Sequence, residues 1–238
     1  MSDLLTLRQF TDSRIALGRA GSSMTARDWL ALREAHAAAR DAVTVEHVAP
    51  DLGAGCIVVA SRCRDRREYL LRPDRGRRLR AEDAARLPRG PFDVVIVVAD
   101  GLSPLAVSRH AANAVEALRV RLAGLALGPI VYVERGRVAI ADEIGETMQA
   151  QAAAILIGER PGLSAADSLG IYVTYAPRIG RTDAERNCIS NIRDGGLGYE
   201  AAAVRCEWLI RESLRRQLSG VNLKEAGATA SLSPSREP

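Results

Sequence analysis

Lysine and aromatic residues are scarce in this sequence of 238 residues. Lys224 is the only lysine among 33 basic residues, so arginine carries nearly all of the positive charge. Nucleic-acid-binding surfaces typically mix the two residues, and the net charge is only +4, so the basic balance is a weak argument for an anionic partner. Aromatic residues make up 4% of the chain, which means that the core must consist mainly of Leu, Val, Ile and Ala.

Several motifs of catalysis and metal binding are also missing. The four cysteines form no C-x-x-C pair and no Cys/His spacing typical of zinc, and four in a chain of this length do not make a disulfide scaffold. The sequence has no P-loop, no G-x-S-x-G and no H-E-x-x-H. Gly18 to Gly21 offers two of the three glycines of a dinucleotide loop, and no buried strand precedes it. We therefore predict no metal site and no catalytic residue in this chain.

Long apolar runs are absent as well. Met1 to Phe10 lacks the apolar core of a signal peptide, and no run approaches the roughly 20 residues that cross a bilayer. We therefore expect a soluble, cytoplasmic protein without a membrane partner.

Short apolar runs are present, and they are typical of strands buried on both faces of a parallel sheet. Between two of them, Gly101 predicts a turn, Ser103 a helix cap and Pro104 the first residue of a helix that ends near Leu125. Such a strand–helix–strand unit predicts parallel pairing. The sequence thus predicts an α/β fold with a mostly parallel sheet flanked by helices, whose strands are Ile57–Ala60, Asp93–Ala99, Ile130–Val133, Ala152–Ile157 and Ile171–Tyr175.

Three parts of the chain are distinguished by composition. Residues 1–55 form an N-terminal helical segment, residues 56–226 the α/β domain, and residues 227–238 a tail that we expect to be disordered. In the first part, Thr25 and Asp28 predict the start of a helix that runs to about Val43. Its apolar stripe, from Trp29 onward, is suited to docking either on the rest of the protein or on a partner.

The stretch from Ala152 to Ile192 holds the strongest candidate site. Its first strand ends at Gly158 and places Glu159 and Arg160 just past the carboxyl end, where open α/β sheets bind ligands. After the second strand we expect a polar loop, whose side chains have no packing role that the sequence explains: Arg178, Arg181, Asp183, Glu185, Arg186 and Cys188. A binding site at these strand ends accounts for both groups, although Glu159 could instead pair with a neighbouring arginine.

Asp100 also follows a buried strand, next to the start of a helix. It either caps that helix or faces the ligand crevice, and the sequence favours neither. The three histidines fall outside the strand-end segments, so acid–base chemistry in this chain would depend on Glu159 or Asp100. A small enzyme that acts alone through Glu159 is therefore one alternative.

The densest charge lies between Arg62 and Arg80, which include nine arginines. Acidic residues partly neutralise the cluster, and only Tyr69 could stack on a base. The cluster is better interpreted as a solvated face or subunit contact, and the alternative is a stand-alone nucleotide- or nucleic-acid-binding module.

Seven fragments, in consistent order from about Leu7 to Lys224, resemble the small (light) subunit of ethanolamine ammonia-lyase. They are R-P-D-R-G-R-R-L (72–79), A-D-G-L-S (99–103), G-R-V-A-I-A-D-E-I-G-E (136–146), G-E-R-P-G-L (158–163), Y-A-P-R (175–178), E-R-N-C-I-S-N-I (185–192) and S-G-V-N-L-K (219–224). The resemblance implies an adenosylcobalamin-dependent lyase that converts ethanolamine to acetaldehyde and ammonia by a radical mechanism. It also implies that this subunit has a Rossmann-like part that covers the cofactor. A large TIM-barrel subunit would carry substrate and catalysis, in an assembly of six large and six small chains.

The resemblance places cofactor contacts at three positions, Val138, Glu159 and Cys188. Without it, Val138 and Cys188 would be interpreted as packing residues. The sequence lacks D-x-H-x-x-G, the pattern by which some proteins replace the cofactor's own base with histidine, so we predict that dimethylbenzimidazole stays on cobalt. Relatives associated with bacterial microcompartments carry an extension before the region that matches from Leu7 onward. Because this sequence has almost none, we expect a cytoplasmic enzyme, and a bacterial microcompartment is the alternative location.

Overall fold

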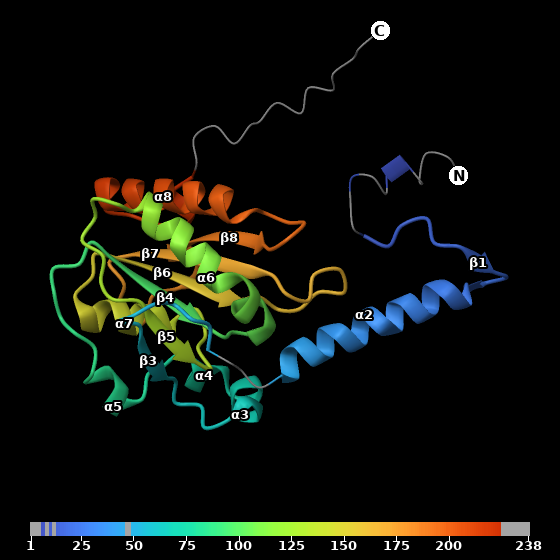
Figure 1. Ribbon diagram of the computed structural model, residues 1–238, viewed down its shortest axis with the longest axis horizontal. Helices are drawn as coiled ribbons and strands as arrows, with labels where there is room; N and C mark the ends of the chain where they lie inside the picture. Colours follow the sequence, from blue (N-terminus) through green and yellow to red (C-terminus); the bar gives the residue numbers. More distant parts are fainter. Residues whose placement is uncertain (1–5, 8–9, 11–12, 46–48, 225–238) are drawn as a thin grey trace, which may run out of the picture.

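The computed structural model describes residues 6–7, 10, 13–45 and 49–224, so the predicted tail at 227–238 lies outside the described residues. A six-stranded sheet forms the centre of the fold (Figure 1). In spatial order its strands are β3 (Ile57–Ala60), β5 (Val131–Glu134), β4 (Val94–Ala99), β6 (Ala152–Gly158), β7 (Leu169–Tyr175) and β8 (Arg186–Ile192).

The sheet is mixed. The pairings β3–β5, β5–β4 and β4–β6 are parallel, whereas β6–β7 and β7–β8 are antiparallel. The α/β class predicted from the sequence is confirmed, and three of the five pairings are parallel. A closer likeness to the Rossmann fold stays a prediction.

Helices cover both faces of the sheet. α6 (Pro104–Arg121) and α8 (Tyr199–Arg216) pack on one face, where Ile96, Leu156 and Val173 belong to the larger hydrophobic cluster. On the other face, Val97 and Ile155 pack with α7 (Ile140–Met148). The short helices α3 (Arg66–Leu71), α4 (Pro73–Gly76) and α5 (Ala81–Ala84) lie between β3 and β4 in the chain.

The unit β4–α6–β5 forms as its sequence predicts. Every residue of β4 is buried, in agreement with its uninterrupted apolar run. The Ser103 side chain accepts a hydrogen bond from the backbone N–H of Ala106 at 3.2 Å, and Pro104 opens the helix. Because β4 and β5 are parallel, the turns that follow them lie side by side at the carboxyl ends of the strands.

The N-terminal segment contains a small hairpin and one long helix. β1 (Arg19–Ala20) pairs with β2 (Ser23–Met24), and α2 (Ala26–Thr44) begins at Thr25, whose side chain accepts from the backbone N–H of Asp28 at 3.2 Å. The predicted cap is thus confirmed.

α2 extends away from the sheet, and Figure 1 shows it reaching the body only near its carboxyl end. Ala42 is its one buried residue, while the side chains of Trp29 and Leu30 are 47% and 60% exposed. The apolar stripe is therefore not docked along its length on the described part of the chain.

One part of the prediction is wrong. Residues 186–192, expected in a polar loop, form the edge strand β8. Only Arg186, Ile189 and Ile192 of this strand are buried, because an antiparallel edge strand can keep one face in water. Its residues therefore look like a loop in the sequence.

The direction of β7 also moves the expected loop. Because β7 runs antiparallel to β6, the segment after Tyr175 lies at the amino-terminal end of β6, whereas Glu159 lies at its carboxyl end. This segment contains the 3-10 helix η2 (Asp183–Glu185), and a second such turn, η3 (Gly220–Asn222), follows α8. In the described part of the chain, helices long and apolar enough to span a membrane are absent.

Candidate cofactor-binding site

A cavity of about 440 Å³ opens at the carboxyl end of β6, on the same side of the sheet as α7. Residues on or just after five strands converge on it. They include Leu102 after β4, Val138 after β5, Ile157 and Glu159 from the end of β6, Tyr172 on β7 and Ser190 on β8. Apolar walls with a few placed polar groups are typical of small-molecule sites.

Glu159 is held by its neighbours in β7 and β8. Its Oε2 atom accepts hydrogen bonds from the Ser168 hydroxyl at 2.6 Å and from the backbone N–H of Asn191 at 3.2 Å. Its Oε1 atom accepts from the Ser190 hydroxyl at 2.5 Å. These partners are hydroxyls and a backbone amide, so the ion pair with a neighbouring arginine, considered from the sequence, is not what holds the Glu159 side chain.

Val138 and Glu159, two of the three predicted contacts, lie on the wall of the same cavity. Val138 is half-buried, packs against the cluster on the α7 face, and follows the turn at Arg135 and Gly136. With Leu102 and Ile157 it forms the apolar part of the wall.

Cys188 lies beside the cavity rather than on its wall. It is directly opposite Tyr172 across β7 and β8. Cys188 is exposed, while desolvation of its thiol by the surrounding side chains raises the thiol's pKa. A ligand that covers Tyr172 and Ser190 would therefore reach Cys188.

Sequence reasoning missed Tyr172 and Ser190. A strand has a period of two, so Cys188 and Ser190 share a face of β8, and recognising β8 as a strand would have identified Ser190. Arg160, expected to reach a ligand, is exposed at the cavity's rim.

Asp100 occupies a separate place at this edge. It does not cap α6, because Ser103 does so. Asp100 is 3% exposed, and its Oδ1 atom accepts from the backbone N–H groups of Gly101 at 2.9 Å and Gly136 at 3.1 Å, which joins the turns after β4 and β5. Burial raises its pKa to about 6, against the opposing effects of backbone N–H groups and Arg66.

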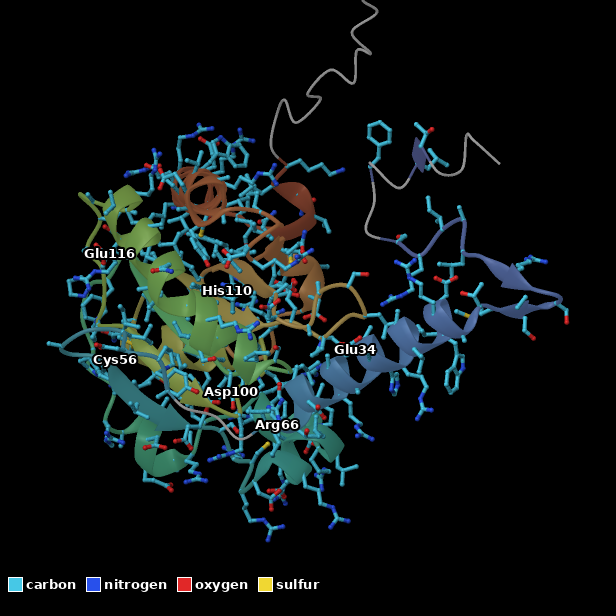
Figure 2. All side chains as sticks on the ribbon, turned by 45° about the vertical axis from the view of Figure 1, so that its right-hand side comes forward. Glu34, Cys56, Arg66, Asp100, His110 and Glu116 are labelled. Atoms are coloured by element: carbon cyan, nitrogen blue, oxygen red, sulfur yellow. The ribbon has the colours of Figure 1, made fainter. Side chains whose placement is uncertain are left out.

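Figure 2 shows Arg66 and Asp100 close to the point where α2 meets the body. The Arg66 guanidinium donates to the carbonyl oxygens of Val43 at the end of α2, Gly101 and Leu102, at 2.8, 2.7 and 3.1 Å. It therefore ties α2 to the β4–α6 turn.

Four of the five charged residues from the expected polar loop are paired, and none of the five lines the cavity. Arg181 pairs with Glu185, and Arg186 pairs with Asp142 and Asp183. These pairs give the residues of the expected polar loop a structural role. The prediction that these charged residues share a site with Glu159 is therefore wrong, whereas the role of Cys188 stays a prediction.

Five of the nine arginines in the Arg62–Arg80 cluster are exposed, but its one aromatic residue is not. Tyr69 is fully buried, and the guanidinium carbons of Arg66 and Arg137 lie 4.7 and 4.2 Å from its ring centroid. It is not available to stack on a base. Arginines of the cluster form ion pairs with Glu68, Asp74 and Glu143.

Comparison with known proteins identifies the family. The sequence model described as ethanolamine ammonia-lyase light chain matches residues 2–224. The chain belongs to this family. Among curated proteins named ethanolamine ammonia-lyase small subunit, one from Ralstonia nicotianae is 51% identical over 97% of this chain and 91% of its own length. One from Azotobacter vinelandii is 52% identical over 95% and 89%, and one from Xanthomonas campestris pv. campestris is 50% identical over 92% and 86%.

Membership of the ethanolamine ammonia-lyase light-chain family makes this chain part of a lyase. The nucleic-acid-binding alternative has no support from these relatives. The resemblance that seven sequence fragments carried is confirmed over nearly the whole chain.

Proposed function

We propose that this chain holds and covers adenosylcobalamin in an ethanolamine ammonia-lyase, and that a large subunit supplies the other half of the pocket. Support comes from family membership together with one observation, the cavity that brings Val138 and Glu159 together at the carboxyl end of β6. The relatives are themselves named small subunits, which supports a larger partner for this chain. For the assembly we propose six large and six small chains, and for its location the cytoplasm.

The residues at the cavity fit the periphery of a corrin. Leu102, Val138 and Ile157 provide an apolar surface against which a ring can pack. Glu159 provides a hydrogen-bond acceptor for amide or hydroxyl groups, and Arg160 a donor at the rim. When bound, adenosylcobalamin supplies the radical chemistry through homolysis of its cobalt–carbon bond. The contribution of this chain is to orient the ligand and to exclude water from one side.

The reacting groups are assigned to the large subunit. Of the described histidines, His36 is exposed on α2 and His110 is buried with its Nδ1 atom 2.7 Å from the Tyr199 hydroxyl, so neither lines the cavity. We also propose that dimethylbenzimidazole stays on cobalt, because the sequence lacks the D-x-H-x-x-G pattern. If cob(II)alamin is added to the complex, hyperfine splitting in its electron paramagnetic resonance spectrum from isotopically labelled histidine would contradict that retention.

The decisive experiment uses this chain co-expressed with the large subunit of the same enzyme. Adenosylcobalamin binding is titrated for the unaltered complex, for Glu159→Ala and for the control Glu116→Ala. Glu116 is an exposed carboxylate on α6 (Figure 2). We expect Glu159→Ala to weaken adenosylcobalamin binding and Glu116→Ala to leave it unchanged, with the complex still assembled in both variants. Unchanged affinity would remove Glu159 from the site, and ethanolamine turnover by this chain without its partner would overturn the division of roles.

A further inference from the structure

The two oxygens of the Glu159 carboxylate have unequal surroundings. Oε2 accepts two hydrogen bonds, from the Ser168 hydroxyl and the Asn191 backbone N–H, whereas Oε1 accepts one, from the Ser190 hydroxyl. Each carboxylate oxygen can accept two hydrogen bonds. Within the described part of the chain, Oε2 is therefore saturated and Oε1 keeps one acceptor position.

Gly170 makes room for this arrangement. A Cβ atom at Gly170 would lie 2.8 Å from Oε1 and 3.3 Å from Cγ of Glu159. The carboxylate therefore lies across the bare backbone of β7, and a side chain there would push Oε1 out of position. Two strands thus fix one orientation of the carboxylate through hydroxyls, an amide and the absence of a side chain.

We propose that Oε1 is the ligand-facing atom of Glu159 and that it accepts a hydrogen bond from an N–H or O–H donor of the bound cofactor. Ser168 and Ser190 are positioning residues that act through Glu159. This inference rests on the proposed cofactor-binding function, and it adds which atom binds, which kind of group it binds and what orients it.

Glutamine at position 159 distinguishes this role from a merely structural one. The Asn191 backbone N–H can only donate, so the carbonyl oxygen of a glutamine must take the Oε2 position. Its NH₂ group then occupies the Oε1 position, where the Ser190 hydroxyl can accept from it. Glu159→Gln therefore keeps the links to β7 and β8 but presents a donor to the ligand's donor.

Ser190 offers a matched pair of variants. Ser190→Ala removes the hydroxyl that donates to Oε1, so this oxygen is held less firmly before binding while Oε2 keeps its two hydrogen bonds. Ser190→Thr keeps a hydroxyl at an exposed strand position, where a β-branched residue is well accommodated. If Ser190 acts only through the carboxylate, its removal has no further effect once Glu159 is alanine.

The test measures adenosylcobalamin affinity of the assembled complex by absorbance titration without ethanolamine, together with the thermal midpoint of each variant. We expect Glu159→Gln to weaken binding roughly tenfold, the effect of losing a hydrogen bond to a charged group, at an unchanged midpoint. Ser190→Ala should weaken binding roughly two- to tenfold, the range expected for ordering one side chain on binding. Ser190→Thr should bind adenosylcobalamin with the affinity of the unaltered complex.

The outcomes separate the two proposals. If Glu159→Ala and Glu159→Gln both leave affinity unchanged, the proposed cofactor contact itself fails. If only Glu159→Ala weakens binding, the contact stands and the assignment of Oε1 is overturned. If Ser190→Ala weakens binding equally in the Glu159→Ala background, Ser190 touches the ligand itself and is not a positioning residue. A large fall in the thermal midpoint of Glu159→Gln would refute the retained links to β7 and β8.

Discussion

Arg186 on β8 donates a hydrogen bond to Asp142 on α7, and each of these two side chains is only 2% exposed. Burial raises the pKa of Asp142 to about 6, against the opposing effect of Arg186. The pair joins the edge strand that carries Cys188 and Ser190 to the helix that follows Val138. Two of the elements around the cavity are thus fixed to each other by buried charge.

Removing one partner of this pair should destabilise the chain strongly. Asp142→Ala leaves the Arg186 guanidinium buried without its main counter-charge, and such losses cost about 3–5 kcal/mol of unfolding free energy. The double variant Asp142→Leu/Arg186→Met should lose less than Asp142→Ala, because no charge stays buried. Urea unfolding measures both.

Glu212→Ala is the control for this prediction, since it breaks ion pairs with Arg215 and Arg216 that lie near the surface of α8. It should cost no more than about 1 kcal/mol. A loss for Asp142→Ala no larger than that of the control would contradict a stabilising role for the buried pair.

The pH dependence of stability should reveal the buried carboxyl of Asp100. Its pKa is raised to about 6 in the folded chain, chiefly by burial, from an ordinary value of 3.8. Between these values the folded state holds a proton that the unfolded state has released, so this group's contribution to stability falls as the pH rises from about 4 to about 6. Above pH 6 the contribution is constant.

Asp100→Asn isolates this effect, because asparagine retains an oxygen for the Gly101 and Gly136 N–H groups and does not titrate. The unfolding free energy of the unaltered chain minus that of the variant should fall by about 2–3 kcal/mol from pH 4 to pH 6. Asp142 titrates in both proteins and cancels. A difference that is flat across this range would show that the Asp100 pKa is not raised.

Cys188 should be protected from alkylation by bound cofactor. It is exposed, whereas Cys63 and Cys206 are buried and Cys56 is half-buried. Cys56 directly precedes β3, at the amino-terminal end of the parallel strands, whereas Glu159 lies at their carboxyl end. It serves as the internal control (Figure 2). In the assembled complex, adenosylcobalamin should reduce iodoacetamide labelling of Cys188 and leave labelling of Cys56 unchanged, as read by mass spectrometry. Equal labelling of Cys188 with and without cofactor would remove it from the site.

The parts of the fold that the sequence predicted are those in which local pattern decides structure. Uninterrupted apolar runs marked β4 and β6 because strands buried on both faces carry no polar residue. Ser103 and Pro104 marked the start of α6 because capping is a short-range interaction. From the end of β6, the place of Glu159 at the carboxyl end of the parallel strands followed directly, and a cavity lies there.

The parts that could not be predicted depend on contacts between distant residues. Only three of the seven residues of β8 are buried, and they follow no alternating pattern, so only its pairing with β7 identifies it as a strand. The antiparallel direction of β7 separated Arg181 from Glu159, and no local signal shows that direction. The hydrogen-bond partners Ser168 and Ser190 lie 9 and 31 positions after Glu159 in the sequence. Only the register of β7 and β8 brings them next to its carboxylate.

The turn between β4 and α6 should tolerate no side chain at Gly101. A Cβ atom there would lie 2.3 Å from the carbonyl oxygen of Gly158 and 2.5 Å from Cγ1 of Ile157, beside the hydrogen bond from Leu102 N–H to Gly158 at 2.9 Å. Its φ of +59° adds strain for any residue with a Cβ. Gly124 is the matched control, because its φ is +88° and a Cβ there would meet no atom within 4 Å.

Alanine at Gly124 should therefore cost only the backbone strain, about 1–2 kcal/mol. Alanine at Gly101 adds a clash with backbone that cannot rotate away, and we expect a loss of at least about 3 kcal/mol in urea unfolding, with β4 and β6 forced apart. Because Glu159 follows Gly158 directly, cofactor affinity should fall for Gly101→Ala and not for Gly124→Ala. Equal losses of stability in the two variants would mean that the turn moves to accommodate the added carbon and that its contact with β6 does not hold the carboxyl end of that strand in place.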